Sequence, residues 1–177
     1  MSNRNDRNNF AYIDGANLHN GISSQGWTLD YRRFRVWLKD KFGVTNAYIF
    51  LGLIPKYAKL YKRLQESGFI LVFKEVVFDA QGKPKGNCDA DLVLQATMDH
   101  FQEKCEQVVI VTSDGDYASL IAMLHGRGSL LAVLSPSQER KCSILIKKTN
   151  VPVTYLTHVR THLQTSNNEK APGQDGT

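Results

Sequence analysis

The sequence predicts an α/β fold, a three-layer α/β/α sandwich with a mainly parallel central sheet. Short apolar runs of β-strand length recur along the chain, and the segments between them carry apolar residues at helical spacing. Strands that alternate with helices are typical of right-handed crossovers between parallel strands. The length of 177 residues and the hydrophobic content of 42% fit one domain with its own core.

In the first half of the chain, three apolar runs predict strands, and the segments that follow them predict helices. The clearest helix lies between Asp30, which can cap its start, and Gly43, which can follow its last turn. Pro55 suits the first turn of another helix, and Gly68 suits its end. We predict strands over 10–14, 47–51 and 69–73, and helices over 15–21, 30–42 and 56–67.

The second half of the chain alternates in the same way after a Gly/Lys loop. Its longest helix carries Val93, Leu94, Met98 and Phe101 around nearly its whole circumference, so we expect this helix to be well buried. The predicted elements are a loop over 79–87, helices over 89–104, 117–124 and 138–148, and strands over 108–112, 129–134 and 151–156.

Composition and charge narrow the functional class. Residues 1–9 and 164–177 are polar and predict a disordered arm and tail around one domain over 10–163. Three cysteines without CxxC spacing predict reduced thiols in a cytoplasmic protein. No apolar run approaches the roughly 20 residues that span a bilayer, so we expect no membrane partner. A net charge of +5 slightly favours a polyanionic partner.

Aspartates follow two of the predicted strands directly. Asp14 ends the first strand, and Asp114 and Asp116 follow the strand over 108–112. The carboxyl ends of parallel strands meet at one edge of a sheet, so these carboxylates are expected to converge. Each aspartate alone also suits a helix cap. Together they would repel one another, which favours a bound divalent cation.

A further pair of acids, Asp89 and Asp91, opens the long helix. Carboxylates in a first turn are stabilised by the helix dipole whatever their function. Both acids share a side of the helix with apolar residues, so helical periodicity does not choose which of them faces the sheet edge. Asp99, near the far end of the helix, is expected to be unrelated to this site.

Basic residues offer two candidate contacts for a phosphate backbone. Lys83 and Lys85 lie in the loop just before Asp89, where they either hold a phosphate or are simply solvated. The helix over 56–67 interleaves lysines with Tyr57 and Tyr61, a pattern that suits a nucleic-acid backbone and its bases, although a solvated outer face is the more common explanation.

Other classes of α/β protein require motifs that this chain lacks. A dinucleotide-binding domain needs G-x-G-x-x-G after its first strand, where this chain has Asp-Gly-Ala-Asn, and a Walker A loop is absent. Haloacid-dehalogenase phosphatases carry a second aspartate at the position of Ala16. A nucleotide-sugar transferase can use an Asp-Gly-Asp motif, but 177 residues is short for one.

Three motifs carry a resemblance to a known family. They are Tyr12-Ile13-Asp14-Gly15-Ala16-Asn17-Leu18, Lys85-Gly86-Asn87-Cys88-Asp89 and Val111-Thr112-Ser113-Asp114-Gly115-Asp116-Tyr117. In order and spacing they resemble the signature blocks of the NYN domain family, part of the PIN-like nuclease superfamily, which includes the LabA-like proteins. The resemblance covers about residues 10–158. It implies a PIN-like (Rossmann-like) nuclease fold, a metal-dependent ribonuclease activity that hydrolyses RNA phosphodiester bonds, and a protein that can form a homodimer.

The resemblance also assigns roles to residues of this chain. Mg²⁺ or Mn²⁺ would activate a water for attack on phosphorus. Gln95 stands where many relatives carry another aspartate, which keeps open a non-catalytic RNA-binding or protein-interaction module, and a small-molecule phosphatase is a third reading. The implied catalytic and metal-binding acids are Asp14, Asp89, Asp114 and Asp116, with Asp91 as a further metal ligand, and the expected substrate contacts are Asn17, Lys83, Lys85 and Ser113.

Overall fold

The computed structural model of the protein describes residues 7–75, 77–78, 80–81, 84–85 and 88–165. Most of the arm predicted over 1–9 and of the tail predicted over 164–177 lies outside these residues. Within them, Asn8 and Asn9 are attached to the domain, because the backbone N–H of Glu106 donates to the carbonyl of Asn8 and the first strand begins at Asn9. The backbone N–H of Thr165 likewise donates to the carbonyl of Thr28.

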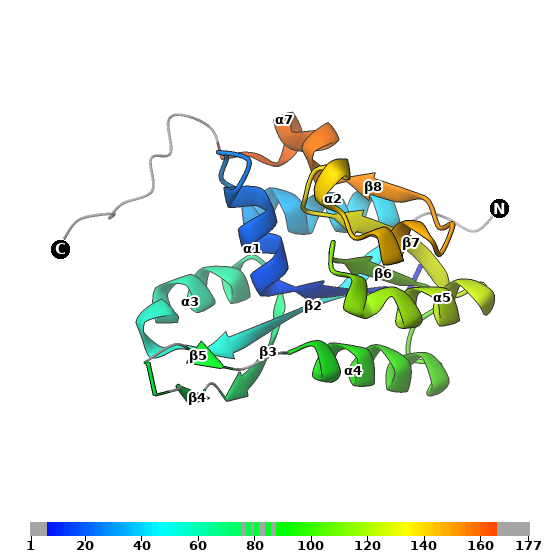
Figure 1. The fold of residues 1–177 in the computed structure, drawn as a ribbon, viewed down its shortest axis with the longest axis horizontal. Helices are drawn as coiled ribbons and strands as arrows, with labels where there is room; N and C mark the ends of the chain where they lie inside the picture. The colour runs from blue at the N-terminus through cyan, green and yellow to red at the C-terminus, as the bar shows by residue number, and fades with distance from the viewer. Residues whose placement is uncertain (1–6, 76, 79, 82–83, 86–87, 166–177) are drawn as a thin grey trace.

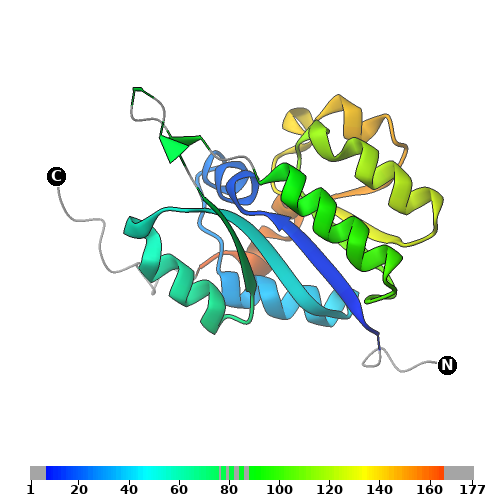
Figure 2. The same cartoon turned by 90° about the horizontal axis from the view of Figure 1, so that it is seen from below.

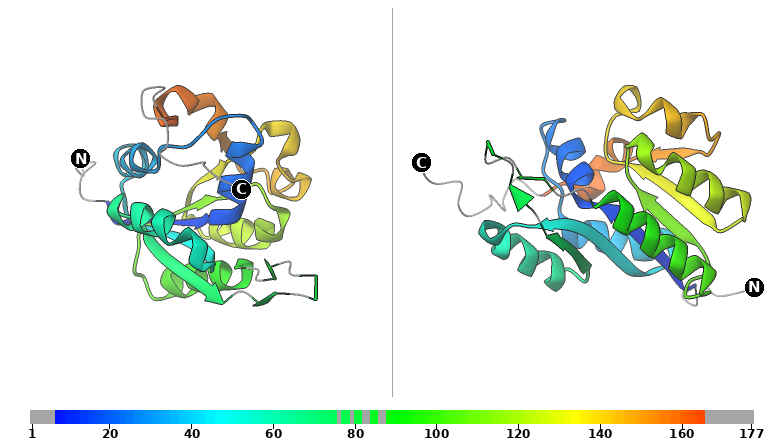
Figure 3. Two further views of the ribbon diagram at one scale, coloured as in Figure 1. Left: turned by 90° about the vertical axis from the view of Figure 1, so that its left-hand side faces the viewer. Right: turned by 60° about the horizontal axis from the view of Figure 1, so that its bottom comes forward.

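The central sheet has six strands in the order β3-β2-β1-β6-β7-β8, and every neighbouring pair is parallel. This arrangement confirms the predicted fold class. A separate antiparallel pair, β4 (Val77–Phe78) with β5 (Pro84–Lys85), lies beyond the end of β3 (Figures 2 and 3). The six strands of the sheet are β1 (Asn9–Asp14), β2 (Val44–Leu53), β3 (Ile70–Glu75), β6 (Val108–Val111), β7 (Leu130–Ser135) and β8 (Val153–Tyr155).

Helices cover both faces of the sheet and form the outer layers (Figure 1). Two separate apolar clusters fill the space between the layers, one on each face of the sheet. The first face carries α1 (Gly15–Ser23), α2 (Tyr31–Phe42), α3 (Ala58–Glu66) and α7 (Arg160–Leu163), and the second carries α4 (Asp89–Phe101), α5 (Ala118–Gly126) and α6 (Ile144–Lys147).

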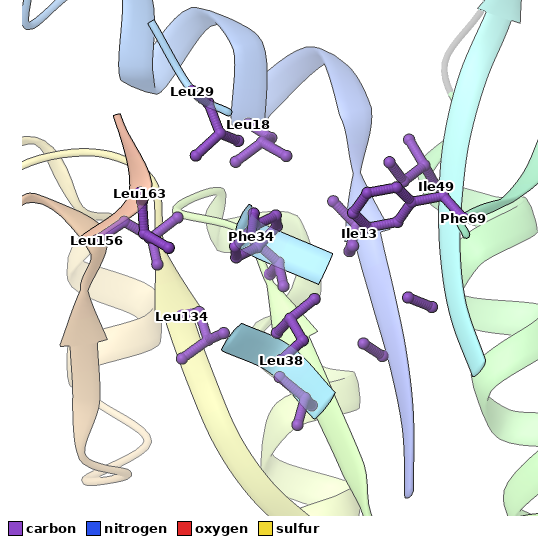
Figure 4. Close-up of a cluster of buried hydrophobic side chains, with 14 of the residues drawn as sticks. Ile13, Leu18, Leu29, Phe34, Leu38, Ile49, Phe69, Leu134, Leu156 and Leu163 are labelled. Carbon is purple, nitrogen blue, oxygen red and sulfur yellow. The ribbon is translucent and has the colours of Figure 1, made fainter. Parts of the chain in front are cut away.

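The helix α2 shows how local sequence sets the ends of an element. The Asp30 side chain accepts a hydrogen bond from the backbone N–H of Arg33, and Gly43 ends the helix with a left-handed φ of 64°. Both predicted caps are therefore confirmed. Phe34 and Leu38 point from this helix into the first apolar cluster, toward Ile13 of β1 (Figure 4).

The structure corrects the predicted burial of α4. Leu92 and Ala96 face the sheet and are buried, whereas Leu94, Met98 and Phe101 are 59%, 45% and 57% exposed. The helix packs through one face only, because it forms the outermost layer over β1 and β6. The prediction that α4 is buried on nearly all sides is therefore wrong, because the apolar residues of its outer side are exposed.

The helix predicted over 138–148 is interrupted. A 3-10 turn over Glu139–Lys141 is followed by extended backbone, and α6 begins only at Ile144. The break has a tertiary cause, because the backbone N–H of Ser143 donates to the carbonyl of Ser113 at 3.0 Å. The other predicted helices and strands are present with end shifts of a few residues. The loop predicted over 79–87 lies partly outside the described residues, and β5 (Pro84–Lys85) lies within it. None of the helices in the described part of the chain is long and apolar enough to cross a bilayer.

Candidate metal centre

The three motifs meet at the carboxyl edge of the sheet. Strands β1 and β6 are parallel neighbours with Ile13 paired to Val111, so Asp14 and the Asp-Gly-Asp segment leave the sheet side by side. The start of α4 lies against the 3-10 turn over Gly115–Tyr117 and brings Asp89 to the same edge. The predicted convergence of the strand-end acids is thus present in the structure.

Three carboxylates form a compact group. One oxygen each of Asp89, Asp114 and Asp116 lies within 4.8 Å of the other two. Asp89 and Asp114 are half-buried, and Asp116 is exposed. Asp114 also caps the 3-10 turn, since it accepts a 3.1 Å hydrogen bond from the backbone N–H of Asp116. The cap interpretation and the cluster interpretation of Asp114 are therefore compatible.

Asp14 adjoins this group without being a member of it. Its Oδ1 accepts a 2.9 Å hydrogen bond from the backbone N–H of Asn17, which caps α1. Burial is the main cause that raises the pKa of the Asp14 carboxyl, and the nearby charges of Asp89 and Asp114 raise it further, against the lowering effect of the hydrogen bonds from Asn17 and Tyr117. Neutralising this carboxylate requires a proton or a cation.

Tyr117 links the acids and was not singled out from the sequence. Its hydroxyl lies 2.5 Å from Oδ1 of Asp89 and 3.3 Å from Oδ2 of Asp14, and the residue is fully buried. Burial and the two carboxylates raise its pKa, so the hydroxyl stays protonated and donates. The only sequence signal was its position directly after Asp-Gly-Asp, where an aromatic residue also suits the core.

Asn17 and Ser113 were predicted to contact substrate, and in the structure they bind each other. Oδ1 of Asn17 accepts hydrogen bonds from the backbone N–H and the hydroxyl of Ser113, at 2.8 and 2.9 Å. The Ser113 hydroxyl is also 2.9 Å from that of Ser137. These contacts tie α1 to the end of β6 and hold the first and third motifs in register. Both residues also line the cleft described below.

Two glycines allow the close approach of the segments that carry the acids. A Cβ on Gly15 would lie 2.7 Å from the carbonyl oxygen of Phe50 and would overlap the Leu51 side chain. A Cβ on Gly115 would overlap the Ser143 hydroxyl. Both motifs therefore need glycine for contact with a neighbouring segment.

Asp91 points elsewhere. Its carboxylate forms a 3.0 Å ion pair with Lys74 of β3, and the structure does not bring it into the group of three acids.

Of the predicted basic contacts, Lys83 lies outside the described residues, and of Lys85 the structure describes only its place in β5. On α3, Tyr61 is buried and its hydroxyl donates to the carbonyl of Gly52.

A cleft of about 940 Å³ opens beside the acids. Asp14, Asp89 and Asp114 line one part of it, and Lys141 adds a basic side chain to the wall. Mg²⁺ and Mn²⁺ prefer carboxylate oxygens as ligands. Among the described residues, the group of three contains aspartates alone and neither histidine nor cysteine. The donor set therefore fits a hard divalent cation.

Comparison with models of protein families shows to which family the chain belongs. The model of the NYN domain matches residues 10–154. The chain belongs to the NYN domain family. The sequence resemblance is thereby confirmed, and all four aspartates of the site, Asp14, Asp89, Asp114 and Asp116, lie inside the matched NYN region.

Two relatives extend the comparison. The chain is 25% identical over 134 residues to the Low amplitude and bright protein LabA of Synechococcus elongatus, with 70% of this chain and 71% of that protein covered. The crystal structure of a protein of unknown function from Vibrio parahaemolyticus superposes with a TM-score of 0.72 at 18% identity. That superposition covers 93% of this chain and 100% of the Vibrio chain, and it supports the fold alone.

Proposed function

We propose that this NYN domain is a metal-dependent ribonuclease whose cation is held by Asp89, Asp114 and Asp116. The observation that carries the proposal is the meeting of three carboxylates within 4.8 Å at the edge where the family motifs converge. Such a group is self-repelling without a counter-charge. A bound Mg²⁺ or Mn²⁺ supplies charge stabilisation at the phosphoryl oxygens and lowers the pKa of a bound water.

The side chains of the site have different proposed roles. Asp89, Asp114 and Asp116 would provide oxygen ligands from two different segments, α4 and the Asp-Gly-Asp turn. Asp14 stands beside them with a raised pKa, and it either completes the cation site or accepts a proton close to the reacting phosphate. Tyr117 orients Asp14 and Asp89 through its single hydroxyl. The proposed mechanism requires no nucleophilic side chain.

RNA is the proposed substrate because of the family and the charge distribution. The protein carries a net charge of +5, although its acids gather at the cleft. Lys141 lines the cleft and can contact a backbone phosphate. The Lys83–Lys85 segment remains a further proposed contact. The predicted homodimer and cytoplasmic location stay predictions.

Cleavage of a labelled RNA in Mn²⁺ tests the proposed function. We expect the wild type to cut, EDTA to abolish cutting, and Asp114→Asn to lower the rate by at least about a hundredfold. Asp40→Asn is the matched control, because it removes one exposed acid of α2. Equal cutting by Asp114→Asn and Asp40→Asn would overturn the ribonuclease proposal.

One observation favours a second candidate function, a non-catalytic RNA-binding or protein-interaction module. Gln95 lies more than one helical turn after Asp89 in α4, and its side-chain amide donates a 2.8 Å hydrogen bond to the carboxylate of Asp99. It contributes nothing to the three acids. If the protein binds RNA but leaves it uncut in Mn²⁺, the module is the correct assignment.

A further inference from the structure

The cleft extends well beyond the acids. Besides the acids, its lining residues include residues of α1 and aromatic and aliphatic residues of β2 and α3. Its volume of about 940 Å³ is at the upper end of small-molecule sites, far more than one phosphate and one cation occupy. The tyrosines among its lining residues are Tyr31, Tyr57 and Tyr61.

The aromatic end of the cleft, lined by Tyr57 and Tyr61, is continuous with its acidic end, lined by Asp14, Asp89 and Asp114. The Leu51 side chain and the Phe50 carbonyl fill the space next to Gly15, the residue after Asp14. Immediately beyond, the Tyr61 hydroxyl donates to the carbonyl of Gly52 and accepts from the backbone N–H of Ile54. These contacts fix the turn that carries Tyr57. Leu51, Gly52, Ile54 and Tyr57 all line the cleft and form a stretch of wall that starts beside Gly15.

Tyr57 presents its ring at the end of this wall. It lies in the 3-10 turn over Pro55–Tyr57, and Tyr57 is 42% exposed. Proline in the first turn restricts the backbone there. The ammonium of Lys56 lies 5.0 Å from the centroid of the Tyr57 ring. A fixed aromatic ring with an adjacent cation suits a nucleobase together with its backbone phosphate.

Tyr31 provides a polar group on the cleft wall. Its ring packs edge-on against Phe69 at 6.3 Å, and burial raises the pKa of its hydroxyl, so the group stays neutral. Among the described residues this hydroxyl has no hydrogen-bond partner. A neutral hydroxyl can both donate to and accept from the edge of a base.

We propose that the aromatic end of the cleft binds an unpaired nucleobase of the RNA strand, with Tyr57 as the stacking surface and Tyr31 as a hydrogen-bonding group. The inference rests on the proposed function, because it places the neighbouring phosphate at the acids. The base must be unpaired, since a base inside a duplex is already stacked on both faces and paired along its edge. A surface that carried only lysines would bind duplex RNA as well as single-stranded RNA.

A binding measurement separate from cleavage tests this subsite. A short single-stranded RNA that contains 2-aminopurine is titrated with protein in EDTA, in the Asp114→Asn background, so that no strand is cut. We expect Tyr57→Ala to weaken binding by about tenfold and to lose the stacking-dependent change in 2-aminopurine fluorescence. Tyr57→Phe, which keeps the ring, should bind like the parent.

Two controls make the result specific. Lys62→Ala removes an exposed cation of α3 that pairs with Glu66, and it should weaken single-stranded and duplex RNA by the same factor. Tyr57→Ala should leave duplex binding unchanged. Tyr31→Phe should lower the affinity for the single strand and keep the fluorescence change.

The outcomes distinguish this inference from the proposed function. If Tyr57→Ala binds the single strand with parental affinity and fluorescence, the base subsite is wrong, whatever the cleavage assay shows. If Tyr57→Ala weakens binding as expected but wild type cuts no RNA in Mn²⁺, the subsite stands and the ribonuclease assignment falls.

Discussion

The hydroxyl of Tyr117 donates to Oδ1 of Asp89 at 2.5 Å and so joins the start of α4 to the turn after β6. The two residues lie 28 positions apart in the sequence. The same hydroxyl lies 3.3 Å from Oδ2 of Asp14. A tyrosine hydroxyl has one proton, so it donates fully to one carboxylate at a time. Among the described residues, this one hydroxyl therefore contacts carboxylates of both α4 and β1.

Tyr117→Phe should weaken cation binding while the core stays packed. The substitution removes only the hydroxyl, so we expect the free energy of unfolding to fall by about 1–2 kcal/mol. Loss of the group that orients Asp89 should lower Mn²⁺ affinity by about tenfold or more. Isothermal titration calorimetry measures the affinity, and urea unfolding in EDTA measures the stability.

Tyr12→Phe is the matched control for this prediction. Tyr12 is also fully buried and donates to a carboxylate, Asp99, at 2.9 Å, but Asp99 lies near the far end of α4. This variant should lose similar stability and keep the wild-type Mn²⁺ affinity. Equal Mn²⁺ affinities in Tyr117→Phe and wild type would show that Tyr117 has only a packing role.

The raised pKa of Asp14 predicts how the stability of the metal-free protein depends on pH. A carboxyl whose pKa is higher in the folded than in the unfolded chain binds more protons when folded. The free energy of unfolding therefore falls as pH rises from about 3.9, the usual value for aspartate, through the raised folded value. Asp14→Asn keeps the cap acceptor and should remove this fall. Urea unfolding in EDTA across that range measures it, and an unchanged slope in the variant would refute the assignment.

Asp89 and Asp91 should behave differently, although sequence periodicity treats them alike. Asp89→Asn should lower Mn²⁺ affinity by more than about tenfold, because it removes one of the three grouped carboxylates. Asp91→Asn should leave the affinity unchanged, because that carboxylate pairs with Lys74. Titrations of both variants decide the matter, and a loss of affinity in Asp91→Asn would place the cation on the other side of α4.

Gly15 and Gly126 form a matched pair for a test of backbone approach. Gly15→Ala should destabilise the fold by about 1–3 kcal/mol, since its Cβ would crowd the Phe50 carbonyl and the Leu51 side chain. Gly126 ends α5 and has open space around the site of a Cβ, so Gly126→Ala should stabilise by about 0.5–1 kcal/mol. Thermal unfolding compares the two variants, and a Gly15→Ala protein as stable as wild type would contradict the structure.

The parts of the fold that depend on local chemistry could be predicted from the sequence. The caps of α2 are set by Asp30 and Gly43, and the structure has both. The meeting of Asp14 with Asp114 followed from parallel topology, because the carboxyl ends of neighbouring strands share one edge.

The remaining features depend on tertiary contacts. The choice of Asp89 over Asp91 depends on Lys74 of a distant strand. The bridging role of Tyr117 depends on two acids from other segments, and an aromatic residue at that position is otherwise expected in the core. The broken helix near Ser143 depends on its hydrogen bond to the carbonyl of Ser113. None of these partners can be identified from local periodicity.

A crystal of the wild-type protein soaked in Mn²⁺ tests the central claim most directly. Anomalous density should appear at bonding distance, about 2.2 Å, from carboxylate oxygens of Asp89, Asp114 and Asp116. The same peak should be absent from an equally soaked Asp114→Asn crystal. A saturated wild-type crystal with no density among these three carboxylates, or with its density beside Asp91 instead, would contradict the proposed metal centre.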